Sequence, residues 1–174
     1  MPILCDDVIK SIVELEQHNP WVGTPFENYK QLNNVQKGNV GEKIVKTYMA
    51  NEGHNVENRK IRTDGYDVVI DGIKTEIKFS LAQTDTKNKK IKNNVFIINH
   101  VSSKKDWERL IFLGINLNQD YYFKFFTKED FVNYFKGKYF SGQQGGSSSG
   151  NDDYMCSGNK LIEMLNEMKD ITEW

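Results

Sequence analysis

Residues 66–79 read YDVVIDGIKTEIKF and contain the clearest structural signal of the sequence. Two runs of alternating apolar and polar residues flank Asp71-Gly72, a residue pair that favours a two-residue hairpin turn. In such a hairpin Ile70 faces Ile73, and each outward step adds a facing pair until Asp67 lies opposite Glu76. We therefore predict a β-hairpin with two carboxylates that face each other.

Side chains alternate between the two faces of this predicted hairpin. The apolar face carries Tyr66, Val68, Ile70, Ile73, Thr75, Ile77 and Phe79, and the other face carries Asp67, Val69, Lys74, Glu76 and Lys78. Like charges that are directly opposed across a hairpin destabilise it by up to about 1 kcal/mol. A hard divalent cation such as Mg²⁺, which prefers oxygen ligands, would offset this repulsion.

Three side chains of this hairpin are therefore candidates for a metal-dependent active site, and a fourth residue could contribute its backbone carbonyl. Asp67 and Glu76 are candidate metal ligands, and the carbonyl of Ile77 is a candidate further ligand. Lys78 could orient an attacking water or neutralise charge on a transition state. In an alternative structural interpretation, Lys74 and Lys78 simply neutralise a solvated hairpin face.

The hydrophobic periodicity of the remaining sequence predicts helices before and after the hairpin, with more strands between them. Helices are predicted at residues 6–17, 24–33, 39–52, 127–135 and 161–171, and strands at 55–60, 66–70, 73–79, 109–116 and 121–126. Residues 93–107 could form a strand, a short helix or both. Residues 141–150 contain only Ser, Gly and Gln and predict a flexible loop.

Asp67 and Glu76-Ile77-Lys78, preceded by a helix with Gly41-Glu42, resemble the PD-(D/E)xK nuclease superfamily, the restriction-endonuclease-like fold. The resemblance covers roughly residues 39–116. It implies an α/β fold with an αβββαβ core, in which helices flank a mixed central sheet. The second core helix would come from residues 93–107. Tyr66 stands where the motif has its proline.

The resemblance also implies roles for individual residues: Asp67 and Glu76 would bind the metal, Lys78 would assist the nucleophilic water, and Glu42 would add an outer-shell contact or help to bind a second ion. The expected activity is that of a Mg²⁺-dependent endodeoxyribonuclease of the type II restriction kind that leaves 5′-phosphates, with Mn²⁺ as a substitute metal. Two alternatives stay open. One is a structure-specific repair or recombination nuclease such as a junction resolvase, and the other is a non-catalytic DNA-binding domain of the same fold.

The formal net charge of −1 excludes a uniformly basic surface, but double-stranded DNA needs only a local basic face. We expect phosphate contacts from Arg59, Lys60 and Arg62 and from the lysine-rich segment between Lys87 and Lys105, which includes Lys89, Lys90 and Lys92. Base contacts are expected from Gln143, Gln144, Asn151, Asp152 and Asp153. A connector role is the alternative for that loop. Cleavage of both strands at a palindrome favours a homodimer.

A chain of 174 residues with 38% hydrophobic and 27% charged residues suits one folded domain. We expect a single nuclease domain over residues 1–174, with a helical arm at 1–38, a catalytic core at 39–126 and a helix, loop and final helix at 127–174. The sequence shows no signal-peptide layout and no apolar run of the roughly 20 residues that a membrane helix needs. A cytoplasmic protein without membrane partners is expected. Cys5 and Cys156 lack metal-ligand spacing.

Overall fold

The computed structural model describes residues 19–59, 65–87, 89–143 and 152–174. The chain divides into two compact units, Met1–Leu32 and Asn33–Trp174. The helix predicted at 6–17 lies outside the described residues. In the described part of the first unit, the helix predicted at 24–33 is replaced by turns and a short 3-10 helix, η1 (Tyr29–Gln31). The Thr24 hydroxyl accepts a hydrogen bond from the Phe26 N–H at 3.1 Å, which favours a local turn over a helix.

The second unit is built on a six-stranded mixed sheet with the strand order β1-β2-β3-β5-β6-β9. Its strands are β1 (Val56–Asn58), β2 (Val68–Ile70), β3 (Ile73–Leu81), β5 (Arg109–Ile115), β6 (Tyr121–Thr127) and β9 (Lys169–Asp170). Strands β3 and β5 are parallel, and the other neighbours are antiparallel. The predicted α/β fold with a mixed central sheet and flanking helices is confirmed.

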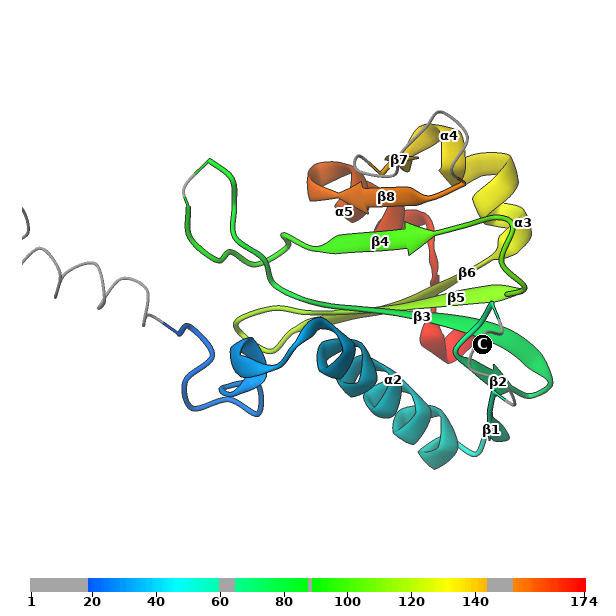
Figure 1. Ribbon diagram of the computed structural model, residues 1–174, viewed down its shortest axis with the longest axis horizontal. Helices are drawn as coiled ribbons and strands as arrows, with labels where there is room; N and C mark the ends of the chain where they lie inside the picture. The colour runs from blue at the N-terminus through cyan, green and yellow to red at the C-terminus, as the bar shows by residue number, and fades with distance from the viewer. Residues whose placement is uncertain (1–18, 60–64, 88, 144–151) are drawn as a thin grey trace, which may run out of the picture. The chain divides into compact units, whose positions relative to one another are not determined.

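Helix α2 (Asn34–Asn51) covers one face of this sheet (Figure 1). It begins at Asn34 rather than at the predicted Asn39, because Asn33 and Gln36 form a capping box in which each side chain accepts the other residue's backbone N–H at 2.9 Å. The buried Val45 and Met49 of α2 belong to the core that forms between the helix and the sheet.

A second, three-stranded antiparallel sheet with the order β4-β8-β7 lies on the opposite face (Figure 1). It consists of β4 (Ile97–Val101), β8 (Tyr154–Ser157) and β7 (Ser141–Gly142), and helix α5 (Gly158–Glu167) follows it. Aromatic pairs such as Phe96 with Phe112 join this layer to the central sheet at a ring separation of 6.0 Å. The central sheet is therefore covered on both faces.

The helical segment predicted at 127–135 is present as α3 (Lys128–Asp130), the π-helical η2 (Phe131–Phe135) and α4 (Lys136–Lys138). Thr127 and Asp130 form the capping box that starts it. After α5 the chain ends with β9 and the 3-10 helix η3 (Ile171–Glu173), so the last helix stops at Glu167 and not at the predicted residue 171. None of the described helices is long and apolar enough to span a membrane.

The prediction of a second core helix in residues 93–107 is wrong. The connection from β3 to β5 forms β4 instead, and residues 93–107 contain no helix. Ile98 of β4 is fully buried and pairs with Cys156 of β8, so this segment obtains its hydrogen-bond partners from a distant part of the chain. That long-range pairing favours a strand where the local pattern allowed either structure.

Gly41 lets α2 approach the sheet closely, and we predict that Gly41→Ala destabilises the protein. A Cβ at this position would overlap the side chain of Phe79 on β3, whereas a Cβ at Gly38 of the same helix would meet open space. Overpacking of this kind costs about 1–3 kcal/mol. Gly38→Ala, the matched control, should stabilise the helix by up to about 1 kcal/mol. Urea unfolding of both variants measures the difference, and equal effects would contradict this packing.

Candidate active site

The β2–β3 hairpin has the predicted register. Val68 pairs with Thr75, Val69 with Lys74 and Ile70 with Ile73. The turn residues Asp71 and Gly72 have φ angles of 51° and 80°, which a two-residue turn with left-handed residues requires. Just before β2, the Asp67 N–H donates to the carbonyl of Thr75, the residue that pairs with Val68, at 2.9 Å, so Asp67 lies just beyond the regular pairing, against residues 75–77 of β3.

Asp67 is held by β3 through its carboxylate as well as its backbone. Its Oδ2 accepts a hydrogen bond from the Ile77 N–H at 2.8 Å, and its Oδ1 lies 3.6 Å from Nη1 of Arg59. Only 18% of the side chain is exposed. Burial and the neighbouring negative charge of Glu76 raise the pKa of Asp67 to about 6, although the Ile77 N–H opposes this shift. Ionisation of Asp67 is therefore less favourable than that of an ordinary aspartate.

Glu76 is the most buried acidic group of the hairpin, with 6% of its side chain exposed. Its Oε1 lies 2.8 Å from Nζ of Lys78 and 3.6 Å from Nζ of Lys105. No hydrogen bond or ion pair within the described ranges engages Oε2. This burial does not fit the alternative of a solvated hairpin face. Lys74, which that interpretation placed beside Glu76, is paired with Asp106 at 2.5 Å.

Glu42 reaches the same neighbourhood from helix α2. Its charge contributes to the raised pKa of Asp67, and its Oε2 is paired with Nζ of Lys46 at 3.3 Å. Among the residues that the structure describes, no three His, Cys, Asp or Glu side chains lie together as a metal-binding group. The oxygens available for a cation are thus those of the two hairpin carboxylates, and the Ile77 carbonyl stays a predicted ligand.

The predicted phosphate-binding residues separate into three groups. Arg59 lies at the hairpin, against Asp67. Lys87, Lys89, Lys90 and Lys92 are exposed on the connection that follows the other end of β3 (Figure 1). Lys60 and Arg62 lie outside the described residues. Gln144 and Asn151, which were predicted to contact bases, also lie outside them.

The remaining residues predicted to contact bases lie around the small sheet. Gln143 accepts a hydrogen bond from the His100 N–H through Oε1 at 3.1 Å, and Asp153 lies 3.1 Å from Nδ1 of His100. Asp152 binds the turn after β4, through Ser102 and Ser103. The structure does not bring these residues into contact with the hairpin carboxylates.

The position of Lys105 at the hairpin was not predicted from the sequence, where this residue was only part of a lysine-rich segment. Its Nζ lies 3.6 Å from Oε1 of Glu76. The predicted strands gave no signal for this contact, because the β4–β5 connection has to fold back onto β3 to make it.

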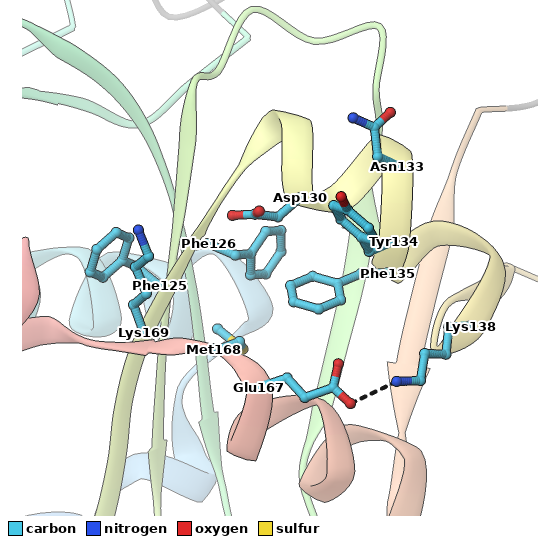
Figure 2. A pocket seen from close by; sticks show the side chains of 10 residues that line it. All are labelled: Phe125, Phe126, Asp130, Asn133, Tyr134, Phe135, Lys138, Glu167, Met168 and Lys169. Atoms are coloured by element: carbon cyan, nitrogen blue, oxygen red, sulfur yellow. Dashed lines mark hydrogen bonds and ion pairs between the residues drawn. The ribbon is translucent and has the colours of Figure 1, made fainter.

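A pocket of about 400 Å³ lies elsewhere, between β6, η2 and the end of α5 (Figure 2). Phe126, Phe135 and Met168 line it, and the pair Lys138–Glu167 closes one side at 2.6 Å. None of the predicted site residues lines this pocket. The hairpin thus remains the candidate active site on chemical grounds.

No protein family and no curated protein matches the sequence. Among solved structures, the chain is similar to the bacterial homing endonuclease I-Ssp6803I, with 16% sequence identity and a TM-score of 0.43. The similarity covers 59% of this chain and 70% of that chain.

The raised pKa of Asp67 predicts a pH-dependent effect of Asp67→Asn on stability. An acid whose pKa is higher in the folded protein than in the unfolded chain contributes stability at low pH. For Asp67 this contribution is lost as the pH rises from 3.8, the ordinary pKa of an aspartate, through about 6, its pKa in the folded protein. The full penalty is at most about 3 kcal/mol. Without divalent metal, Asp67→Asn should therefore gain stability relative to the parent between about pH 4 and pH 8.

Urea unfolding in EDTA at both pH values measures this difference. The asparagine Oδ1 still accepts the Ile77 N–H, so that the variant removes mainly the charge. A stability difference that does not change with pH, or that moves in the opposite direction, would contradict the described environment of Asp67.

Proposed function

We propose that this protein is a Mg²⁺-dependent endodeoxyribonuclease that cleaves double-stranded DNA, of the type II restriction kind. The observation that carries the proposal is the pair Asp67 and Glu76 at the β2–β3 hairpin, where the charge of Glu76 acts on Asp67 and Nζ of Lys78 lies 2.8 Å from Glu76. Two carboxylates and an adjacent ammonium group are the set of groups that metal-assisted phosphodiester hydrolysis needs.

The chemistry of these residues fits a hard divalent cation. Both proposed ligands are carboxylates, and the pKa of about 6 at Asp67 reflects first its burial and then the negative charge of Glu76. A bound Mg²⁺ would neutralise this charge, polarise the scissile phosphate and make a water more acidic. Mn²⁺ is expected to substitute for it.

The side chains around the carboxylates would then orient the reactants. Lys78 extends from β3 with 18% of its side chain exposed, so that it is held in place but still accessible. We assign to it the orientation of the attacking water and the neutralisation of charge on the phosphate. Glu42, whose charge already acts on Asp67, would add an outer-shell contact or help to hold a second ion.

Recognition of DNA and assembly complete the proposal. The exposed lysines 87, 89, 90 and 92 would contact phosphates and so position the duplex, without reading its sequence. One hairpin attacks one strand at a time, so double-strand cleavage at a palindrome calls for a two-fold homodimer. Sedimentation measurements test the proposed homodimer. The proposed restriction role also implies a cytoplasmic location.

The activity test is incubation of the purified protein with phage or plasmid DNA and MgCl₂, followed by sequencing of the fragment ends. We expect discrete ends with 5′-phosphates, no cleavage in EDTA and recovery with MnCl₂. Ragged ends would remove the sequence-specific restriction role. Preferential cleavage of branched DNA would favour a junction-resolving nuclease, and intact DNA under all conditions would contradict nuclease function.

Asp67→Asn and Lys78→Ala should each lower the cleavage rate at least about 100-fold while the proteins still fold, because each change removes a group that contacts the metal or the phosphate. The matched controls Asp120→Asn and Lys169→Ala change the same residue types at exposed positions and should cut at the parental rate. Initial cleavage rates and circular dichroism give the comparison. Parental rates in both hairpin variants would refute the assigned roles.

A further inference from the structure

We propose that Lys105 is a second phosphate-binding cation of the nuclease site, and that Asp152 is the positioning residue that holds the loop carrying it. This inference rests on the proposed function and deepens it. It joins the C-terminal part of the chain, which follows the glycine- and serine-rich stretch, to the chemistry at the β2–β3 hairpin.

Lys105 lies on the connection between β4 and β5, and its side chain reaches Glu76. The separation between its Nζ and Oε1 of Glu76 is 3.6 Å, longer than the 2.8 Å of the Lys78 contact, and 43% of the Lys105 side chain is exposed. Lys78 is thus the close and enclosed partner of Glu76. Lys105 approaches from the solvent side, where a substrate would arrive.

The backbone around Lys105 is held far more firmly than an exposed lysine loop requires. The Asp152 carboxylate accepts hydrogen bonds from the hydroxyls of Ser102 and Ser103 at 2.7 Å and from the Lys104 N–H at 2.8 Å. Nζ of Lys136 lies 3.3 Å from the same carboxylate. Although burial alone acts to raise the pKa of Asp152, these hydrogen bonds hold it well below its ordinary value.

Further contacts fix the other side of the loop. Nζ of Lys128 donates to the Lys105 carbonyl at 2.5 Å, and Asp106 is paired with Lys74 of β3. Gly65 lies so close that a Cβ there would overlap the Asp106 backbone. The loop is therefore anchored on several sides, and of its exposed residues Lys104, Lys105 and Asp106, Lys105 is the one whose side chain pairs with Glu76.

The phosphate role follows from charge. A divalent cation between the hairpin carboxylates would repel an ammonium group 3.6 Å from Glu76, and the nearest anion in an enzyme–DNA complex would be the backbone phosphate. Because the Lys105 main chain is fixed, its ammonium group can move only within reach of the site.

The first experiment compares Lys105→Ala with Lys104→Ala, which removes the same charge one residue away. We expect Lys105→Ala to lower kcat about 10- to 100-fold, as the loss of a charge-assisted contact to the reacting group does. Lys104→Ala should affect KM without this loss of kcat, and Lys169→Ala should do neither. Equal effects of Lys105→Ala and Lys104→Ala, or a parental kcat for Lys105→Ala, would overturn the assignment of Lys105.

The second experiment tests Asp152 by a double-mutant cycle. If Asp152 acts through Lys105, Asp152→Asn lowers kcat in the parent but changes it less than about twofold in the Lys105→Ala background. Ser103→Ala, a milder release of the same loop, covers the case in which Asp152→Asn does not fold, and Asp120→Asn is the matched control. Additive losses would assign Asp152 a role independent of Lys105 and overturn the positioning claim.

A binding measurement separates failure of this inference from failure of the proposed function. Fluorescence anisotropy of a labelled DNA duplex, with CaCl₂ in place of MgCl₂ so that an oxygen-binding cation is still present, measures binding without relying on cleavage. There Lys105→Ala should weaken binding and reduce the salt slope by about one phosphate contact. If the parent binds DNA without cutting it, the nuclease proposal fails, and this slope still supports or refutes the Lys105 contact. If the parent does not bind DNA, both are wrong.

Discussion

The candidate site depends on one hydrogen bond across a tight hairpin, from the Ile77 N–H to the carboxylate of Asp67 at 2.8 Å. Asp67 lies outside the regular pairing of β2, so this bond fixes its side chain to β3 and next to Glu76. The same contact partly offsets the cost of a buried negative charge, but burial and Glu76 outweigh it. The hairpin thereby holds two carboxylates whose mutual repulsion a bound cation would reduce.

The rest of the second unit keeps these two carboxylates in this arrangement. The central sheet is covered by α2 on one face and by the small sheet on the other, so β3 cannot shift its register without exposing one of two apolar cores. Gly41 lets α2 lie against Phe79, and the next residue, Glu42, brings a further negative charge toward Asp67. Basic side chains from β3 and from the β4–β5 connection provide the opposing charge.

The sequence was sufficient for the features that local rules determine. Asp71-Gly72 specified the turn, and the turn specified the register of Val68–Ile70 against Ile73–Thr75. The second core helix could not be predicted correctly, because residues 97–101 become a strand only through pairing with β8. The positions of Lys105 and Asp152 escaped prediction for the same reason, since both depend on the fold of the β4–β5 connection and on contacts from the C-terminal part of the chain.

An NMR titration of the Asp67 side-chain carboxyl carbon, with and without Mg²⁺, tests the proposed metal site directly. We expect a pKa of about 6 in EDTA and a marked fall when Mg²⁺ is added, because the cation would stabilise the ionised carboxylate. Asp120, in an exposed turn, serves as an internal reference whose titration should not respond to the metal. An ordinary pKa for Asp67 that is the same in both solutions would contradict the proposed cation site at the hairpin.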